Sequence, residues 1–538
     1  MRGRPQSGET QAVSDMQLEF LIPAQLGIDG LQSRLKEDLR FETEPAHTLR
    51  RVYYDSFDWR LHAHGSVLEE DRQGGSNGAT LVWRQLNSGN SQLQLSVSAA
   101  PRFVWDLPGG HFRDRLQPVL EMRELIPLIR TDSRTRTLRV LNKEDKTVLR
   151  LVIEKNTVRD LEGKTHQALD SRVVVLPVKG YRKALRHVVT ALEGLGLVPV
   201  QDDLMLTALA RVGRSPGTYT SKLDLNLDPA MRADAATRQI LHRLLDIMVA
   251  NEAGTRVGSD SEFLHDFRVA IRRTRSALTQ VKGVLPARTL DRFKAEFAWL
   301  GQLTTPSRDL DVYLLNFDDY RASLPESAQN DLGPLWEFLR RHQQQEHEKL
   351  VKGLESARYR RLIQDWRAFL EAPLPKRSTL PNATRPIYEV ACKRIWRVYR
   401  RALAEGQAIT PQSPAEALHE LRKTCKKLRY LIEFFQSLYP KAEIKRLIKV
   451  LKTLQDNLGT FQDLQVQGET LRHFSHQMTA EAEVPPETLM AMGVLVEHLE
   501  HRQHQAREAF AARFAEFALP ENRKQFRDLF GARQTEPE

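Results

Sequence analysis

The sequence predicts an α+β protein in which an antiparallel sheet is followed by an all-α region built from two similar halves. Short runs of alternating apolar and polar residues, typical of half-buried strands, lie before residue 180. After residue 222 the patterns are helical, and one basic segment occurs twice. Between the two regions stands GRSPGTYTSK (213–222), whose Gly, Ser and Pro residues indicate a linker.

The N-terminal region carries the strand-like runs. They stand at residues 18–23, 80–86, 136–141, 147–155 and 172–179, with helical patterns at 27–40 and 183–196. In one of them, Leu149, Leu151 and Ile153 face one way while Arg150 and Glu154 face the other. We therefore expect an antiparallel sheet with one apolar and one charged face, curled around a charged interior.

Each half of the C-terminal region contains a histidine followed by a row of cations. HDFRVAIRRTR (265–275) aligns with HELRKTCKKLR (419–429) at an offset of 419 − 265 = 154 residues. The matched pairs are His265 with His419, Arg268 with Arg422, Arg272 with Lys426, Arg273 with Lys427, and Arg275 with Arg429. The register continues without a gap to Asp309 over Asp463, so the repeat predicts one domain of two similar halves.

On a helix, the first, fourth, eighth and eleventh residues of each basic segment share a sector of roughly 80°. Only Asp266 and Glu420 are acidic in these segments, so the positive charge is not compensated locally. We interpret the stripes as an anion-binding face, with a solvated basic surface as the alternative. Neither histidine has a metal-ligand partner at i+3 or i+4, so we expect hydrogen bonds to the anion rather than zinc.

A further basic helix opens the second half at residues 391–403, where Arg394, Arg397 and Arg401 stack on one side. Arg397 lies 154 residues after Arg243, whereas Ile240 and Ile247 stand opposite the other two arginines. We expect an asymmetric channel that is richer in cations on the side of the second half.

The segments NEAGTRVGSDSEFLHDFRVAIRRTRSAL (251–278), RDLDVY (308–313) and HELRKTCKKLRYLIEFF (419–435) resemble the CHAD domain over about residues 222–530. The resemblance implies two four-helix halves around a basic channel that binds inorganic polyphosphate, and it establishes no catalysis. The polyphosphate-binding residues that we expect are His265, Arg268, Arg272, Arg273, Arg275, His419, Arg422, Lys423, Lys426, Lys427, Arg429, Arg243, Arg394, Arg397 and Arg401.

The N-terminal region resembles the CYTH or triphosphate-tunnel family in YYDSFDWRLHAHG (53–65), VWRQL, RTDSRTRTLRV and VVVLPVKGYRKAL. Members are eight-stranded tunnels that hydrolyse or cyclise triphosphates with magnesium or manganese. Their opening Glu-x-Glu-x-Lys signature aligns here with residues 15–19, DMQLE, which lacks both glutamates and the lysine. On the late strand, Val175 and Pro177 stand where the family has glutamates, and Lys179 stands at the position of the family's lysine.

What remains of the tunnel is its cationic half, and the expected anion-binding residues there are Arg84, Arg134, Arg136, Arg139 and Lys179. Glu154 and Glu121 remain as single candidate ligands. The missing carboxylates predict an anion-binding or purely structural barrel without triphosphatase turnover. We therefore expect no catalytic residue, no cofactor and no bound metal.

Composition agrees with a polyanionic partner, because 80 Lys and Arg against 69 Asp and Glu give a net charge of +11. No apolar run is long enough to span a membrane, and we expect a cytoplasmic protein, associated with polyphosphate granules. The expected domains are a disordered N-terminus (1–14), a degenerate CYTH-like tunnel (15–213), a linker (214–222) and a CHAD-like domain (223–530) with halves at about 223–370 and 387–530.

Three functions stay open. The first is polyphosphate binding, the second a metal-dependent tripolyphosphatase that recruits acidic ligands from unaligned positions, and the third nucleic-acid binding by the same basic stripes. The last is disfavoured because no helix-turn-helix, zinc finger or aromatic RNA-binding strand is evident. We expect no specific nucleic-acid partner, and the sequence leaves protein partners undetermined.

Overall fold

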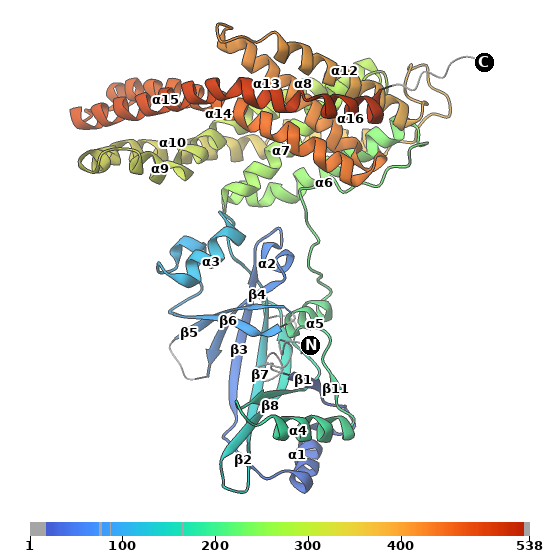
Figure 1. Cartoon of the computed structure of the whole chain (residues 1–538), viewed down its shortest axis with the longest axis vertical. Helices are drawn as coiled ribbons and strands as arrows, with labels where there is room; N and C mark the ends of the chain where they lie inside the picture. The colour runs from blue at the N-terminus through green and yellow to red at the C-terminus, as the bar shows by residue number, and fades with distance from the viewer. Residues whose placement is uncertain (1–17, 75–77, 87, 164–165, 532–538) are drawn as a thin grey trace, which may run out of the picture. The chain divides into compact units, whose positions relative to one another are not determined.

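The computed structural model describes residues 18–74, 78–86, 88–163 and 166–531 (Figure 1). The chain forms two compact units, Met1–Thr220 and Ser221–Glu538, here named the sheet unit and the helical unit. The division falls inside the expected linker. The expected disordered residues 1–14 lie outside the described residues.

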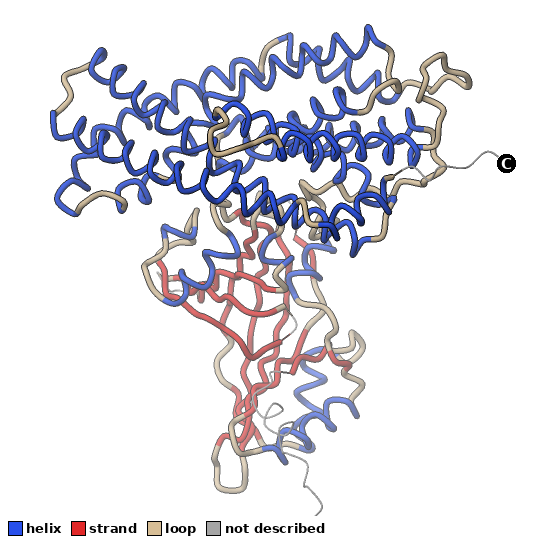
Figure 2. Tube along the Cα trace, turned by 45° about the horizontal axis from the view of Figure 1, so that its top comes forward, coloured by secondary structure: helices blue, strands red, loops and turns tan. Residues whose placement is uncertain are grey.

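The sheet unit contains an eleven-stranded antiparallel sheet (Figure 2). The strands are β1(Leu18–Leu21), β2(Phe41–Thr43), β3(His47–Asp55), β4(Ser66–Gln73), β5(Ala79–Gln85), β6(Ser88–Val97), β7(Ile126–Leu141), β8(Thr147–Arg159), β9(His166–Ala168), β10(Arg172–Pro177) and β11(Val198–Pro199). Their order is β11-β1-β10-β8-β7-β3-β4-β5-β6, with β2 beside β7 and β9 beside β8. This confirms the predicted antiparallel sheet, although it has more strands than the eight that the resemblance implies.

Two of the helices of this unit cover part of one face of the sheet. The helices of the unit are α1(Gly27–Asp38), α2(Arg60–Ala63), α3(His111–Leu120), α4(Arg182–Gly194) and α5(Leu204–Arg211). Leu35 of α1 and Leu192 of α4 pack against Leu151 and Ile153 of β8 in one apolar cluster. The alternate residue Glu154 points to the opposite, charged side, where it lines a cavity. The predicted separation of an apolar and a charged face is therefore confirmed for β8.

The helical unit repeats its helices at the offset found in the sequence. Its first half contains α6(Ala233–Val257), α7(Ser261–Gln280), α8(Ala287–Leu315), α9(Phe317–Ala322), η3(Glu326–Leu332), α10(Gly333–Leu354) and α11(Ala357–Glu371). Its second half contains α12(Ile387–Gln407), α13(Ala415–Phe435), η4(Gln436–Leu438), α14(Lys441–Glu481), α15(Pro486–Phe517) and α16(Pro520–Phe530). Helices α12, α13 and α14 each begin 154 residues after α6, α7 and α8.

Equivalent positions of the two halves also meet each other, as a two-fold relation requires. Arg232 forms an isolated β-bridge with Pro386, and the Tyr313 hydroxyl donates to the Gln467 carbonyl oxygen at 3.4 Å. Both pairs are separated by 154 residues in the sequence. The repeat is therefore one packed unit with its two halves face to face.

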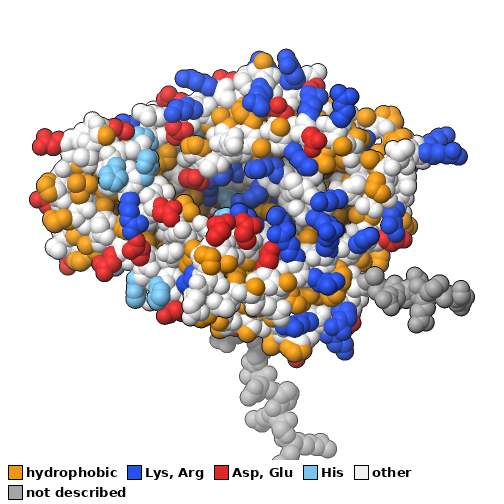
Figure 3. Space-filling model, turned by 90° about the horizontal axis from the view of Figure 1, so that it is seen from above, with side chains coloured by type: hydrophobic (Ala, Val, Ile, Leu, Met, Phe, Trp, Pro, Cys, Tyr) orange, Lys and Arg blue, Asp and Glu red, His pale blue; other side chains and the backbone are white. Residues whose placement is uncertain are grey.

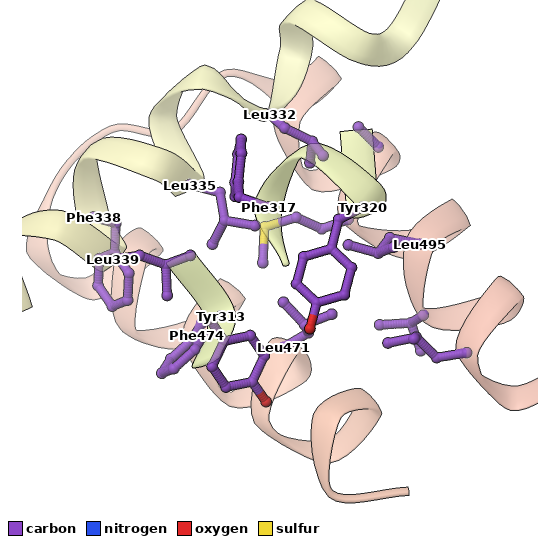
Figure 4. Packing of buried hydrophobic residues seen from close by; sticks show 14 of the residues in the cluster. Tyr313, Phe317, Tyr320, Leu332, Leu335, Phe338, Leu339, Leu471, Phe474 and Leu495 are labelled. Atoms are coloured by element: carbon purple, nitrogen blue, oxygen red, sulfur yellow. The ribbon is translucent and has the colours of Figure 1, made fainter. Parts of the chain in front are cut away.

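An apolar cluster joins the halves at the ends of α8 and α14 (Figure 4). Tyr313 of α8 packs edge-to-face on Phe474 of α14, with ring centroids 5.4 Å apart. Phe338 of α10 and Leu495 of α15 complete the same cluster. Burial of these large side chains is the main stabilising contribution here, because apolar area removed from water drives folding. Within the described residues, no helix has the length and apolar character needed to cross a membrane.

Candidate anion-binding site

Helices α7, α13 and α14 enclose a cavity of about 550 Å³ in the helical unit, here named the α7–α13 cavity. It is lined by Ser221, Lys222, His265, Asp266, Val269, Arg272, Arg273, Arg422, Lys426, Arg429, Tyr430, Gln455, Asp456, Gly459, Thr460 and Asp463. Figure 3 shows that Lys and Arg side chains gather in and around a hollow on one face of this unit. Six of the lining side chains are Lys or Arg and three are Asp, so positive charge prevails.

Part of the expected residue set meets at this cavity: His265, Arg272, Arg273, Arg422, Lys426 and Arg429 line it. The others on the same two helices do not. Arg268 instead donates to the hydroxyls of Thr304 and Thr305 at 2.9 and 3.0 Å. Arg275 lies against Gly301 of α8, and Lys423 pairs with Glu420 at 2.6 Å. Three of the four stripe residues predicted on α13 therefore line the cavity, all except His419. On α7 the lining side is rotated from the predicted stripe, because packing against α8 fixes which side of α7 is open.

A single carboxylate links the two basic helices at this cavity. Glu433 of α13 accepts from Arg429 at 2.7 Å and from Arg273 of α7 at 2.9 Å, and its side chain is 12% exposed. Arg422 pairs with Asp463 of α14 at 2.9 Å. These pairs hold three guanidinium groups in fixed positions and leave further N–H donors for a ligand.

Arg272 and Lys426, which are equivalent in the repeat, have no carboxylate within ion-pair distance among the described residues. Burial, and then the neighbouring charges of Arg422 and Arg272, lower the pKa of Lys426 to about 8. The charge of Asp463 acts in the opposite sense but does not cancel this effect, so like charges are held together with incomplete compensation. An anion between them would remove that cost.

The two histidines differ. The Arg308 guanidinium donates to Nδ1 of His265 at 3.3 Å, which assigns the imidazole proton to Nε2. His419 lies 2.6 Å from the Gln462 side-chain oxygen through Nδ1 and does not line the cavity. His419 therefore does not meet His265 at this cavity, and its Nδ1 is engaged by the glutamine that replaces Arg308.

The remaining expected cations lie elsewhere. Arg394, Arg397, Arg401 and Lys427 line a separate cavity of about 300 Å³, here named the α12 pocket. Arg243 of α6 lines neither cavity. The structure thus divides the single predicted channel into two basic cavities, because Lys426 and Lys427 are neighbours in sequence but point to different sides of α13.

Sequence reasoning missed the contribution of α14. Asp456, Gly459, Thr460 and Asp463 line the α7–α13 cavity, and Asp266 adds a carboxylate from α7. A signal was present for one of them, because Asp463 matches Asp309 in the repeat. For the others no sequence pattern indicates which side of this long helix faces α7 and α13.

The sheet unit has its own charged cavity, about 630 Å³, here named the sheet cavity. Arg84 donates to Asp203 and, at 3.3 Å, to Glu69. Arg51 lies 3.3 Å from Glu154 and 3.4 Å from Asp71. In the same lining, Arg172 pairs with Glu19 at 3.3 Å. Three arginines thus face six carboxylate side chains, counting Asp202 at the edge.

Of the five cations expected to bind an anion in the tunnel, only Arg84 lines the sheet cavity. Thr135 and Thr137 of β7 face it, so the intervening Arg134 and Arg136 point to the other side. Arg136 donates to Gln32 of α1 at 3.0 Å, Arg139 pairs with Glu42, and Lys179 is exposed beyond β10. None of these four residues lines the cavity. Arg134 and Arg136 lie on the outer face of β7, and Lys179 lies past the end of β10. Arg139 is engaged by Glu42.

The strand alignment behind these expectations also needs correction. On β10 it is Val174 and Leu176 that line the sheet cavity, while Val175 packs into the apolar cluster on the opposite face. Glu121, a candidate ligand by sequence, pairs with Arg60 and does not line the cavity. The cavity-facing residues of β10 are still apolar, so this strand supplies no carboxylate.

The triphosphate-tunnel resemblance implies a divalent metal, and the donor set does not fit one. Within the described residues, no group of three or more His, Cys, Asp and Glu side chains is arranged to hold a metal ion. The carboxylates of the sheet cavity are instead engaged by Arg51, Arg84 and Arg172. A hard cation needs several oxygen ligands free to converge on it, which these ion pairs prevent.

Residues 239–472 match the family model of the CHAD domain. The helical unit contains a CHAD domain. Among solved structures, the CHAD domain of the plant Ricinus communis is 25% identical, with 55% of this chain and 95% of that chain covered and a TM-score of 0.46. PptA from Streptomyces chartreusis is 17% identical, with 53% and 99% covered and a TM-score of 0.41.

A third solved structure is similar to the region before the CHAD domain. It is a putative adenylyl cyclase from Hippeastrum, HpAC1, described as having a dominant triphosphatase activity. It is 12% identical, with 38% of this chain and 100% of that chain covered and a TM-score of 0.27. A search of curated proteins found no match.

Proposed function

We propose that the α7–α13 cavity of the CHAD domain binds inorganic polyphosphate. The observation that carries this proposal is the pair Arg272 and Lys426, two cations from facing helices that have no carboxylate of the described residues within ion-pair distance. The charge of Asp463 offsets their repulsion only in part. A protein that keeps such a pair in a cavity bears an electrostatic cost that a bound polyanion removes. The CHAD resemblance implies the same ligand.

Binding would begin with long-range attraction and end in charge-assisted hydrogen bonds. Arg272, Arg273, Arg422 and Arg429 present planar N–H forks to phosphate oxygens, and Lys426 adds a point charge. Each such bond contributes on the order of 1.5 to 3 kcal/mol before the cost of removing water. Several in series favour long chains over short ones, and screening weakens them as salt is added.

A bare phosphate chain suits this cavity better than a nucleic-acid duplex. The cavity is enclosed by three helices and holds about 550 Å³, so it admits a thin chain that carries charge on every unit. A duplex presents its phosphates on the outside of a wide helix and would contact only the rim. Weak binding of DNA at low salt is nevertheless expected of any chain with a net charge of +11.

The sheet unit enters this proposal as a structural or accessory element without hydrolysis. Its arginines are matched by carboxylates, so the sheet cavity offers a polyanion repulsion rather than attraction. We also propose that polyphosphate binding places the protein on polyphosphate granules. Fluorescence imaging of the tagged protein in cells with and without polyphosphate tests this, because diffuse signal in both would contradict it.

The direct test measures binding of long-chain polyphosphate to the purified full chain at about 0.15 M salt with magnesium present. Duplex DNA serves as competitor, and free phosphate is followed in the same sample. We expect tight binding that DNA does not displace and no release of phosphate. Displacement by DNA would favour the nucleic-acid function, and steady phosphate release would show that the sheet unit is a tripolyphosphatase.

A further inference from the structure

The α12 pocket carries positive charge that no carboxylate in its lining neutralises, although Arg401 pairs with Glu405 outside the lining at 2.6 Å. Five cations line it, and no carboxylate among the described residues does: the cations are Lys282, Arg394, Arg397, Arg401 and Lys427. We propose that this pocket is a second anion site, separate from the α7–α13 cavity, that binds a compact ligand with clustered phosphoryl oxygens, of the size of pyrophosphate or tripolyphosphate. This goes beyond the proposed function, because it does not depend on which polyanion the larger cavity holds.

The internal repeat shows the equivalent cation with its charge paired. Arg273 of the first half pairs with Glu433 at 2.9 Å. The repeat-equivalents of these two residues are Lys427 and Thr279, which both line the α12 pocket. Threonine therefore stands where the carboxylate would be, and the cation of the second half has lost its counter-charge.

A second difference between the halves also makes the α12 pocket more positive. Ile240 and Ile247 of α6 are buried to 1% and 2% exposure, so apolar side chains fill the equivalent place in the first half. Their counterparts on α12 are Arg394 and Arg401. A packed apolar contact has thus been replaced by two guanidinium groups, which opens the pocket and adds charge to it.

Polar groups inside the pocket also lack partners. Thr424 is 1% exposed and lines the pocket, yet its hydroxyl makes no hydrogen bond within the described residues. Arg394 donates to Gln280 at 2.8 Å, but its Nε–H has no partner there. Burial, followed by the charge of Arg397, lowers the pKa of Arg394. A buried hydroxyl and a guanidinium without a counter-charge are costly unless a ligand satisfies them.

The volume and the position of the α12 pocket indicate which kind of ligand it binds. At about 300 Å³ the pocket has little more than half the volume of the α7–α13 cavity, so it suits a short anion rather than a threaded chain. Lys427 reaches it from one side of α13, while Lys426 serves the larger cavity from the other. Substitutions can therefore change the charge of the residues that line one cavity and leave the lining of the other unchanged.

The deciding variant copies the carboxylate of Glu433 to the equivalent position of the first half. Thr279→Glu restores the carboxylate that Glu433 supplies to Arg273, and Thr279→Gln adds a side chain of similar size without charge. Binding of tripolyphosphate to the full chain is measured by calorimetry in the Arg272→Glu/Lys426→Glu background, which disables the larger cavity. We expect this background to bind tripolyphosphate, the Gln variant to bind within about threefold, and the Glu variant to lose at least about tenfold.

Equal binding by the Glu and Gln variants, or no binding by the folded background protein, would overturn the second site. As a control for unfolding of the background, the same pair of variants is also compared in the otherwise unchanged chain, where the Glu variant should lose one tripolyphosphate site and keep long-chain binding. Inositol hexakisphosphate, a phosphate ester, is titrated in parallel. Tighter binding of the ester than of tripolyphosphate would identify an organic ligand, and the reverse an inorganic one.

Discussion

The α7–α13 cavity and the sheet cavity carry opposite charge although both contain arginines. The α7–α13 cavity is lined by six Lys or Arg side chains and three aspartates, whereas the sheet cavity is lined by three arginines and six carboxylates. In each cavity, a residue that carries the prevailing charge has its pKa shifted in favour of its neutral form. Lys426 has a lowered pKa in the first, and burial together with Glu69 raises the pKa of Asp71 to about 7 in the second.

The comparison shows that an arginine in a cavity does not by itself indicate an anion site. Arg84 is engaged by Glu69 and Asp203 and has a structural role, whereas Arg272 has no carboxylate partner among the described residues. The surplus of charge after pairing is what predicts a ligand. Variants that change this surplus should affect binding in one cavity and stability in the other.

The largest expected effect is on binding in the α7–α13 cavity. Arg272→Glu combined with Lys426→Glu should weaken long-chain polyphosphate binding on the order of 10² to 10⁴-fold, since two charge-assisted contacts become repulsive. Fluorescence anisotropy with labelled polyphosphate measures it. Arg275→Glu with Lys423→Glu makes the same charge change on α7 and α13 outside the cavity and should cost less than about threefold. Similar losses in both double variants would mean that net charge, not the cavity, binds polyphosphate.

A loss of stability of similar size is expected in the sheet unit. Arg84→Ala leaves Glu69 and Asp203, with side chains 9% and 6% exposed, without their guanidinium partner. Breaking such a buried pair costs roughly 3 to 5 kcal/mol of unfolding free energy. Hydrogen exchange over residues 18–213 of the full chain measures it, with Arg50→Ala, an exposed ion pair of β3, as the control. Unchanged polyphosphate affinity in Arg84→Ala would support separate roles for the cavities, and a large loss would contradict them.

A smaller effect is expected from the titration of Lys426. Its ammonium group must be protonated to bind an anion, so affinity for polyphosphate should fall about tenfold as pH rises from 7 to about 9.5. Lys426→Arg keeps its charge over this range and should flatten the profile. Stability should change in the opposite sense. Because the folded-state pKa lies below the usual lysine value of 10.5, the unfolded chain binds more protons between about 8 and 10.5, and unfolding free energy rises with pH there. An identical pH profile in both proteins would exclude Lys426 from the binding site.

The smallest effect is expected from Asp71 of the sheet cavity. The pKa of Asp71 in the folded protein is about 7, above the usual aspartate value of 3.8. Between these two pH values the folded protein therefore binds a proton that the unfolded chain does not. Unfolding free energy of the sheet unit should therefore decrease as pH rises from about 4 to 7, by on the order of 1 kcal/mol or more. Asp71→Asn should remove that part of the slope in exchange experiments at pH 5 and 7. A slope unchanged by the substitution would show that other carboxylates carry the charge cost.

The sequence predicted those elements in which the spacing of apolar residues matches the side that is buried. The run at 147–155 became most of β8, and the segments at 265–275 and 419–429 lie on α7 and α13 as predicted. It missed β4, which reads SVLEEDRQ, because Glu69 and Asp71 face a charged interior and do not give an apolar alternation. It also placed Arg134 and Arg136 inside the tunnel. The residues of β7 that do face the cavity include Thr135 and Thr137, and threonines do not indicate from sequence which face of a strand is buried.

The sequence by itself determined the two regions, the 154-residue repeat and the excess of cations on two equivalent helices, because these depend on spacing and composition along the chain. Only the tertiary structure decided which cations share a cavity. Lys426 and Lys427 are adjacent in sequence and serve different cavities, while Arg273 and Arg429 meet at Glu433 across two helices. The charge of a site depends on its partners from other elements, and the packing of those elements places them.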